Sequence, residues 1–230
     1  EAIAEERFLI VYDPNRPFSV RMKNNVEQVL AGMKKTYSTV EAGAELPKLD
    51  RQDAVILAFS DWSLIRDRSW LTDYVQAGGN VLLLGVPDLN DGFYMLYRQV
   101  GILEAGEYVE TEGITLQTNV LIGYKGATFD RASLQNTVLR VKLSDEVSLL
   151  ATAGGKYPIL WKMPYGNGAF LVFNGTMLQE KTSRGLIAGA IGLMLPDFVY
   201  PVINAKVMFI DDFPAPFPNG EDANISRLYH

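Results

Sequence analysis

Apolar residues in the first 88 positions form short continuous runs separated by a helical pattern. Residues 8–12, 53–59 and 81–84 are β-rich apolar runs of the kind that forms strands buried on both faces. Apolar side chains recur at helical spacing across residues 19–35, and residues 36–40 are expected to form another strand. Strands and helices that alternate over short connections predict a parallel sheet with right-handed crossovers.

The pattern changes further along the chain. Residues 70–76 still have helical periodicity, and Gly78-Gly79 is expected to end that helix as a C-cap. Short β-like runs that predict an antiparallel insertion follow at residues 108–110, 120–124, 138–143 and 148–151. Residues 157–162 and 168–173 then predict a hairpin, because the YGNG sequence at the end of the connection is a strong turn signal.

A final apolar helix, rich in glycine and alanine, is expected over residues 183–195. The predicted fold class is therefore α/β, a doubly wound and mainly parallel sheet with an antiparallel β insertion or extension. We expect residues 1–6 to be a linker, residues 7–200 the α/β domain, and residues 201–230 a tail or the start of a second domain. Because the sequence opens at Glu1, either an upstream signal or anchor segment was removed or the sequence is an excised piece.

The composition excludes several classes of protein. Apolar residues make up 48% of the chain, which is enough to bury a sizeable core. With 21 Lys and Arg against 27 Asp and Glu, the net charge of −6 argues against a surface that binds nucleic acid. No apolar run reaches the roughly 18 residues of a membrane span. The sequence has no cysteine, which rules out disulfides, thiolate zinc sites and cysteine nucleophiles.

Polar residues follow two of the predicted strands. Asp13 follows the first strand, and Ser60 and Asp61 follow the third. Open α/β sheets bind ligands at the carboxyl ends of their strands, so these three side chains are candidate ligand-binding residues. The alternative is that Asp13 and Asp61 only cap the helices that follow them. Ser60 would need a basic partner to act as a nucleophile, and the only histidine of the chain is His230.

A pair of carboxylates follows another apolar run near the end of the sequence. Residues 207–210 predict a buried strand that delivers Asp211 and Asp212 into a proline-rich loop. Aspartates at such a strand end are typical of metal ligands and general bases in α/β enzymes. They are equally typical of an ordinary turn.

Three stretches of the sequence match one known fold in pattern and order. They are residues 53–62 (DAVILAFSDW), 74–85 (YVQAGGNVLLLG) and 158–178 (PILWKMPYGNGAFLVFNGTML), the last leading into KTSRGLI. Together they resemble the class I glutamine amidotransferase-like fold, a flavodoxin-like architecture, in the variants used as non-catalytic modules beside carbohydrate-active domains. Catalytic members place a cysteine after the strand that corresponds to VLLLG, where this sequence reads Gly85-Val86-Pro87-Asp88. Residues 160–200 contain no histidine, so we expect no glutaminase activity.

The end of the sequence resembles a different family. Residues 209–216 (FIDDFPAP) are similar to the first motif of the polysaccharide deacetylases. The resemblance implies that Asp211 is a general base and Asp212 a metal ligand. Phe213 replaces the usual glycine, and the later His-x-x-x-His ligands are absent. Because metal-assisted hydrolysis needs about three protein ligands, we expect no cofactor in this chain and a zinc-like divalent metal only in a longer protein.

An uncharacterised bacterial family joins an amidotransferase-like domain to a deacetylase-like domain, and this chain resembles its N-terminal portion. The resemblance implies a non-catalytic binding or scaffolding domain of an extracellular or cell-surface protein, anchored upstream of residue 1. Its expected partners are the downstream deacetylase-like domain and a polysaccharide. Sugar rings would stack on aromatic side chains that otherwise pack in the core or its rim, namely Trp62, Trp70, Tyr94 and Tyr97.

Two other functions stay open. One is a fragment of a metal-dependent polysaccharide deacetylase, a carbohydrate esterase that would bind its metal through Asp212. The other is a small-molecule sensor that binds its ligand in the crevice near Asp13 and Asp61.

Overall fold

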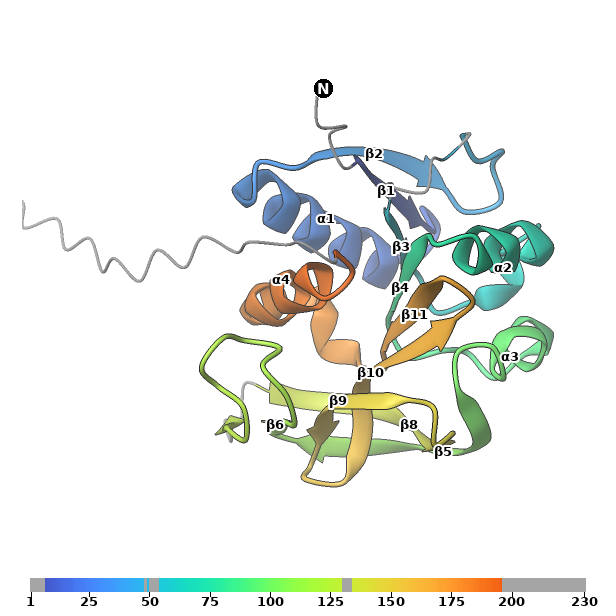
Figure 1. Cartoon of the computed structure of the whole chain (residues 1–230). Coiled ribbons are helices and arrows are strands. Elements are labelled where there is room, and N and C mark those ends of the chain that lie inside the picture. The colour runs from blue at the N-terminus through green and yellow to red at the C-terminus, as the bar shows by residue number, and fades with distance from the viewer. Residues whose placement is uncertain (1–6, 48, 50–53, 130–133, 196–230) are drawn as a thin grey trace, which may run out of the picture. The chain divides into compact units, whose positions relative to one another are not determined.

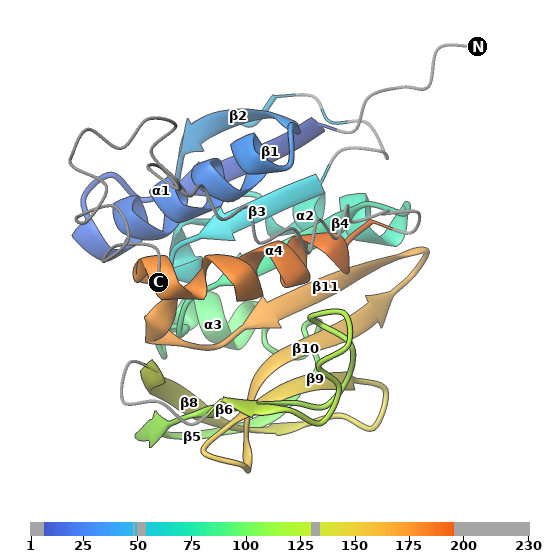
Figure 2. The ribbon, with the colours of Figure 1, turned by 90° about the vertical axis from the view of Figure 1, so that its left-hand side faces the viewer.

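The computed structural model describes residues 7–47, 49, 54–129 and 134–195. Within these residues the chain forms a nine-stranded mixed sheet and a separate two-stranded sheet (Figure 1). Helices lie against both faces of the larger sheet (Figures 1 and 2). The α/β class predicted from the sequence is therefore confirmed.

The first part of the large sheet is parallel. Its strands are short and mostly apolar: β1 (Arg7–Tyr12), β2 (Thr36–Glu41), β3 (Ala54–Ala58), β4 (Asn80–Leu84) and β11 (Gly168–Phe173). β1 lies between β2 and β3, and β4 lies between β3 and β11, with every pair parallel. All five residues of β3 are buried, as expected for a strand covered on both faces.

Helices cover the two faces of this parallel part. α1 (Pro17–Gly32) and α4 (Arg184–Gly192) pack together on one face, and α2 (Arg68–Gln76) and α3 (Asp91–Leu96) lie on the other (Figure 1). Among the described residues, short 3₁₀ turns in the connections include η1 (Trp62–Leu64), η3 (Thr176–Gln179) and η4 (Lys181–Ser183). Gly78, with a φ of 118°, follows the end of α2 as predicted, because a residue without Cβ adopts this conformation easily.

The second part of the large sheet is antiparallel. It consists of β10 (Tyr157–Tyr165), β9 (Ser148–Ala153), β6 (Ile114–Leu116) and β7 (Thr128–Phe129). The complete order is β2-β1-β3-β4-β11-β10-β9-β6-β7. The predicted hairpin is β10-β11, with Gly166 in its turn. β5 (Ile102–Glu112) and β8 (Gln135–Leu143) form the separate antiparallel pair.

The antiparallel extension is thus confirmed, but one of its predicted strands is wrong. Residues 120–124 form turns rather than a strand. Gly123 has a φ of 83°, which extended backbone does not allow. Ile122 is 63% exposed, so the apolar side chains that suggested a strand do not share a buried face.

Two buried side chains connect the two-stranded sheet to its surroundings. Asn174, which follows β11, accepts a hydrogen bond from the Leu139 N–H at 3.0 Å and donates to the carbonyls of Leu139 at 2.8 Å and Pro158 at 3.1 Å. Nε1 of Trp161 donates to the Val100 carbonyl at 2.8 Å. The Asn174 bonds fix β8 against the end of β11, and the Trp161 bond fixes β10 against the segment that leads into β5.

Candidate functional site

The strand order reverses at β1. From β1 the chain reaches β2 on one side and then β3 on the other. Open α/β sheets bind ligands beyond the carboxyl ends of their strands at such a reversal. Asp13 follows β1, Ser60 and Asp61 follow β3, and Asp88 follows β4. The three predicted ligand-binding residues of the described chain therefore meet at one edge of the sheet.

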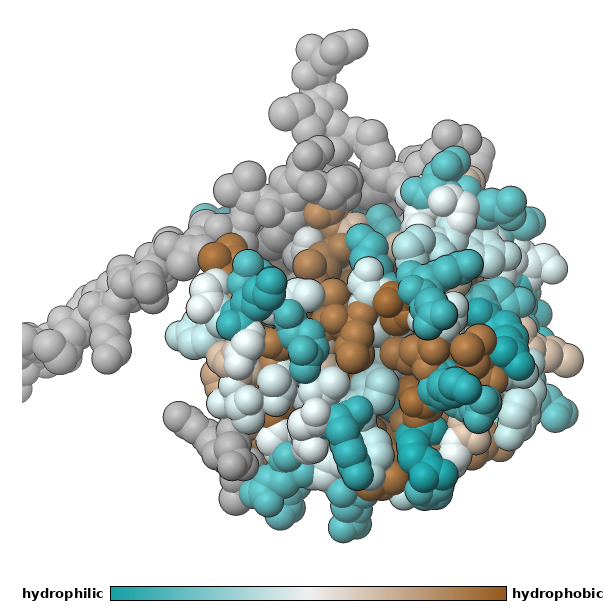
Figure 3. All heavy atoms as spheres, turned by 60° about the horizontal axis from the view of Figure 1, so that its bottom comes forward, coloured by the Kyte–Doolittle hydropathy of each residue, from teal (hydrophilic) through white to brown (hydrophobic). Residues whose placement is uncertain are grey.

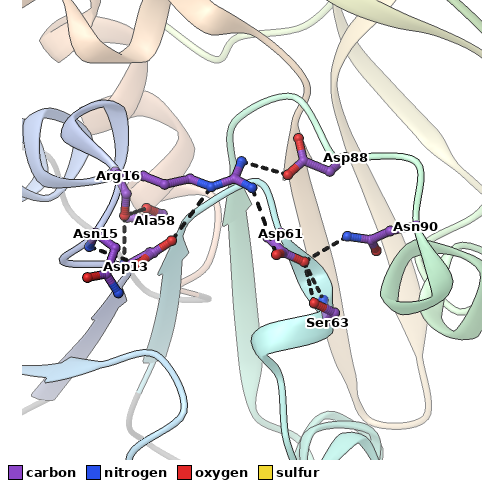
Figure 4. A network of polar contacts seen from close by, with 9 residues as sticks. Asp13, Asn15, Arg16, Ala58, Asp61, Ser63, Asp88 and Asn90 are labelled. Carbon is purple, nitrogen blue, oxygen red and sulfur yellow. Dashed lines mark hydrogen bonds and ion pairs between the residues drawn. The ribbon is translucent and has the colours of Figure 1, made fainter.

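Arg16 lies at the centre of this edge and contacts three carboxylates (Figure 4). Its Nη1 donates to Oδ2 of Asp88 at 2.7 Å. Its Nε lies 3.7 Å from Oδ2 of Asp13, and its Nη2 lies 3.9 Å from Oδ2 of Asp61. The Arg16 side chain is 45% exposed, so the guanidinium links the loops after three strands while part of its surface faces solvent.

Asp61 is held by several hydrogen bonds. Its Oδ1 accepts from the Ser63 N–H at 3.0 Å, from the Ser63 hydroxyl at 2.5 Å and from Nδ2 of Asn90 at 2.7 Å. Burial by itself raises the pKa of Asp61, but these hydrogen bonds and the charge of Arg16 outweigh it and place the pKa below its ordinary value. Asp61 thus caps η1, as the alternative interpretation of the sequence predicts. It also carries negative charge at the sheet edge.

Asp13 is buried and does not cap α1. The N-cap position of α1 is Arg16, which makes no side-chain cap. Oδ1 of Asp13 instead accepts from the Asn15 N–H at 2.9 Å, and the Asp13 N–H donates to the Ser19 hydroxyl at 2.8 Å. That hydroxyl donates in turn to the Ala58 carbonyl at 2.5 Å. The first turn of α1 is therefore fixed to the end of β3, which positions Arg16.

Ser60 is buried, with 7% of its surface exposed. Its carbonyl accepts from the Asp88 N–H at 2.9 Å, which ties the loop after β4 to the loop after β3. Gly85 has a φ of 103°, and a Cβ there would lie 3.1 Å from Oγ of Ser60. Among the described residues there is no histidine that could activate the Ser60 hydroxyl.

Two tyrosines lie beside the loop that follows β4 and contains Asp88, which we call the Asp88 loop. Tyr108 is 47% exposed; its hydroxyl donates to the Pro87 carbonyl at 3.0 Å and accepts from the Leu89 N–H at 3.2 Å. Burial, together with the negative charge of Asp88, raises the pKa of Tyr108, although the bond from Leu89 lowers it. Tyr94 of α3 is 58% exposed, and its ring meets that of Phe93 edge-on at 5.2 Å.

The other aromatic candidates differ in exposure. Trp62 is only 1% exposed and stacks on Phe93 with ring centroids 5.5 Å apart, so the expectation that it contacts a sugar is wrong. Its side chain fills the space between η1 and α3. Trp70 stacks on Tyr74 at 5.7 Å and is partly buried. Tyr97 is also partly buried and packs against Phe93 at 5.5 Å.

We call Asp13, Arg16, Asp61, Asp88 and Asn90 the carboxyl-edge network. It combines the donors of a guanidinium and an amide with the acceptors of three carboxylates, all oriented by backbone or side-chain contacts. Three carboxylates against one guanidinium leave the network negatively charged. A hydroxyl group both donates and accepts, so the network can bind hydroxyl groups in fixed orientations.

Comparison with known proteins identifies the family. The model described as "Uncharacterised protein conserved in bacteria (DUF2194)" matches residues 1–144 and 128–230, and these two matches together span the whole sequence. The chain belongs to this family. No curated protein matches the sequence.

Solved structures share the fold of this DUF2194 chain at low sequence identity. A ThuA-like protein from Bacteroides uniformis ATCC 8492 has a TM-score of 0.63 at 13% identity, over 84% of this chain and 94% of that one. The exo-beta-1,4-mannosidase Op5Man5 from Opitutaceae bacterium strain TAV5 has a TM-score of 0.58 at 16% identity, over 84% and 36%. The beta-galactosidase from Rahnella sp. R3 has a TM-score of 0.56 at 17% identity, over 84% and 32%.

The chain spans about a third of the length of these two glycosidases. At such low identities the likeness establishes the fold alone. That fold is the class I glutamine amidotransferase-like fold of the ThuA-like proteins, which agrees with the resemblance found in the sequence.

Asp211 and Asp212 lie outside the described residues, so their roles stay predictions. Within the described ranges, no three His, Asp or Glu side chains are grouped so as to hold a metal ion. None of the helices in the same ranges is long and apolar enough to cross a membrane.

Sequence reasoning missed Arg16, Asp88 and Asn90. Asp88 follows a predicted strand just as Asp13 does, so the same argument would have found it.

Proposed function

We propose that this DUF2194 chain is a non-catalytic carbohydrate-binding and scaffolding domain of a bacterial cell-surface protein that takes part in polysaccharide modification. The observation that carries the proposal is the carboxyl-edge network beside two exposed tyrosine rings. Sugars are bound by planar polar side chains that hydrogen-bond their hydroxyls and by aromatic rings that cover their apolar faces. Both elements are present around the Asp88 loop.

The orientation of the network supports binding of a neutral sugar. Arg16 and Asp88 are 45% and 36% exposed, so each offers a polar group to solvent while already held by a 2.7 Å hydrogen bond. Side chains fixed before binding lose little conformational entropy when a ligand arrives. The hydroxyl of Tyr108 anchors the same loop at Pro87 and Leu89, which keeps its ring next to Asp88.

The residues present support the non-catalytic part of the proposal. The sequence has no cysteine, and the loop after β4, where catalytic relatives of the fold hold their nucleophile, reads Gly85-Val86-Pro87. Ser60, the nearest hydroxyl candidate, is buried and lacks an imidazole partner among the described residues. Acyl transfer of the glutaminase type needs a nucleophile and a base held together.

The sequence after the described domain supports the role in a larger protein. The similarity of residues 209–216 to a deacetylase motif favours a downstream polysaccharide deacetylase-like domain, which this domain would position on its substrate.

The finer classification of the sheet as doubly wound and flavodoxin-like belongs to the same proposal. It is supported by helices on both faces and by the strand order at β1.

Binding assays test the proposal. The chain of residues 1–230 is titrated calorimetrically with cello-, xylo- and manno-oligosaccharides and assayed for release of glutamate from glutamine. We expect binding of at least one oligosaccharide, no glutaminase activity, and a loss of affinity of about tenfold in Arg16→Met and in Tyr94→Ala.

Matched controls separate the site from general surface effects. Arg140→Met removes an exposed arginine from β8, and Tyr124→Ala removes a 52% exposed tyrosine far along the chain from Tyr94. Both should leave affinity unchanged, and thermal melting should show that all four variants fold. Failure to bind any of the oligosaccharides, or equal binding by Arg16→Met and Arg140→Met, would refute the proposal.

A small-molecule sensor is the second candidate, favoured by one cavity. A mainly apolar cavity of about 320 Å³ lies on the α2 side of the same strand ends. Leu57, Phe59 and Trp70 line it, and so do the charged residues Glu45, Arg66 and Asp67. Thermal melting across a library of aromatic and aliphatic metabolites tests it. Stabilisation that disappears in Leu57→Asn would favour a sensor, and a flat profile would count against one.

A further inference from the structure

The connection from β2 to β3 leaves a cavity against the sheet. These two strands lie on either side of β1 and run parallel, so residues 42–53 must cross one face of the sheet. Such connections usually contain a helix. The described residues of this one, 42–47 and 49, form turns and irregular backbone, and Gly43 and Ala44 have little or no side chain to fill the space. The cavity of about 320 Å³ beside this connection is called the crossover cavity.

The floor of the crossover cavity is apolar and closely packed. Leu57, Phe59 and Leu71 line it, and each is at most 3% exposed. Trp70 forms one wall, and its ring is stacked on that of Tyr74 with centroids 5.7 Å apart and 7° between the ring planes. Since an apolar cavity of about 150 Å³ can bind benzene, this one has room for an aromatic or branched aliphatic group.

Apolar side chains also reach the surface elsewhere. On the side of β5 and β8, apolar and hydrophilic groups lie side by side (Figure 3). Such a mixed surface favours no particular ligand. In the crossover cavity the apolar groups are instead gathered below the surface, and the polar groups lie around the opening.

The opening of the crossover cavity carries charges of both signs. Glu45, Arg66 and Asp67 line the cavity and are exposed, so their charged groups lie at its mouth. Oδ1 of Asp67 accepts from the Trp70 N–H at 2.8 Å, which orients this carboxylate as the N-cap of α2. Glu45 and Arg66 form no hydrogen bond or ion pair with their side chains in the described part of the chain. One cation and two anions are therefore available at the mouth.

Arg66 is positioned by packing rather than by an ion pair. A Cβ on Gly43, which has a φ of 85°, would lie 3.3 Å from Nε, 3.5 Å from Nη2 and 3.7 Å from Cζ of Arg66. These similar distances show that the guanidinium packs against the backbone of the loop after β2. The Arg66 side chain therefore bridges two segments that line the cavity. Its N–H groups stay available to an acceptor at the mouth.

We propose that the crossover cavity binds a free α-amino acid with an aromatic or branched aliphatic side chain. The apolar side chain of the ligand packs on Leu57, Phe59 and Trp70. Its carboxylate pairs with Arg66, because a guanidinium and a carboxylate form strong charge-assisted hydrogen bonds. Its ammonium group pairs with Asp67 or Glu45. A hydrocarbon would leave all of these charges unpaired, and a simple carboxylate would leave both anions unpaired.

This inference rests on the second candidate function, since it names the ligand class of the cavity that favours a sensor. It does not depend on carbohydrate binding at the carboxyl-edge network. The two sites lie at the same edge of the sheet, so the chain could respond to an amino acid at one and bind a sugar at the other.

Calorimetric titration tests the inference with ligands that differ by one charged group. The chain of residues 1–230 is titrated with phenylalanine, with 3-phenylpropionate, which lacks the amine, and with phenethylamine, which lacks the carboxylate. We expect phenylalanine to bind at least about tenfold more tightly than either analogue. Leucine should also bind, and glutamine, which has a polar side chain, should not.

Variants at the mouth assign each charge. Arg66→Met should weaken phenylalanine binding about tenfold and leave phenethylamine binding unchanged. Asp67→Asn keeps the N-cap, because asparagine caps as well as aspartate. Combined with Glu45→Gln, it should weaken phenylalanine binding about tenfold without weakening that of 3-phenylpropionate.

Matched controls are Arg140→Met on β8 and Asp73→Asn on α2, which change exposed residues outside the cavity lining. Each should change phenylalanine affinity by less than about twofold, and thermal melting should show that every variant folds. Equal affinity for phenylalanine and its two analogues, or equal loss in Arg66→Met and Arg140→Met, would overturn the inference. If oligosaccharides bind and no amino acid does, only this inference fails. If other metabolites stabilise the chain through Leu57 and amino acids do not, the inference fails and the sensor stands.

Discussion

The carboxyl-edge network and the polar pocket at the end of β5 and the start of β8 are both acidic, but their charges are balanced differently. This second region, which includes Glu110, Glu112 and Asn136, is called the β5–β8 pocket. In the network, Arg16 lies between Asp13, Asp61 and Asp88 and contacts each of them within 3.9 Å. In the pocket, a buried amide fixes the wall and no cation accompanies the two glutamates within the described residues. The two regions therefore differ in where the nearest cation lies.

This difference in charge balance arises from the pairing of β5 with β8 and from the positions of the loops in the parallel part of the sheet. The cations of β8 lie opposite the first half of β5, while the second half of β5 meets Thr137 and Gln135. In the parallel part of the sheet, Arg16 reaches three carboxylates because the loops after β1, β3 and β4 meet at one edge. Charge balance is thus a property of the fold, which a count of acidic and basic residues does not reveal.

The largest expected effect follows from removing the amide that supports the pocket. Asn136→Ala leaves the N–H groups of Thr176 and Met177 without their acceptor. We expect the free energy of unfolding to fall by about 2–4 kcal/mol in urea titrations. Gln135→Ala, on the neighbouring exposed position of β8, should change it by less than about 0.5 kcal/mol. Similar losses in both variants would show that the Asn136 amide does not support the wall.

Removal of the cation from the network should have an intermediate effect. Arg16→Met removes the cation that lies between three carboxylates. We expect the free energy of unfolding to fall by about 1–2 kcal/mol at neutral pH. The loss is no larger because water screens the partly exposed guanidinium. Since the loss comes from repulsion, it should shrink in 1 M NaCl, where charges are screened beyond about 3 Å.

The matched control for this variant is Arg140→Met. Among the described residues Arg140 forms an ion pair with Glu107, and both side chains are more than half exposed. The expected loss is below about 0.5 kcal/mol. A salt-insensitive loss in Arg16→Met would indicate that the aliphatic part of the side chain, rather than its charge, stabilises the loops.

The strands of the parallel part were predictable because burial on both faces leaves a continuous apolar run. Residues 53–59 and 81–84 gave β3 and β4 to within a residue or two. β5 was found only as residues 108–110 although it has 11 residues, because the exposed Glu104 and Glu107 interrupt the alternation of polar and apolar positions. The short helix α3 was missed, since six residues show too little periodicity.

The candidate site was predictable only in part. Asp13 and Asp61 could be found because the end of a buried strand can be recognised from the neighbouring residues in the sequence. The role of Arg16 depends on the meeting of loops 72 residues apart in sequence, from Arg16 to Asp88, and no local pattern indicates such a contact. The β5–β8 pocket could not be predicted for the same reason, since its properties depend on which residues β8 places opposite Glu110 and Glu112.

The smallest expected effect concerns the pH dependence that Asp61 adds to stability. Hydrogen bonds from Ser63 and Asn90 and the charge of Arg16 outweigh burial and hold the pKa of Asp61 below its ordinary value of about 3.9. The unfolded chain therefore binds a proton there more readily than the folded chain. The stability that Asp61 contributes is present above about pH 4 and is lost as the pH falls through the lower, folded-state pKa.

Urea titrations between pH 6 and pH 3 test this. The free energy of unfolding should decline less steeply for Asp61→Asn than for the unmodified chain. Asp145→Asn, in an exposed turn, should keep the full decline. If the two variants lose stability in parallel, the donors around Asp61 do not favour its charged form, and the distinction between the network and the pocket would rest on Arg16 alone.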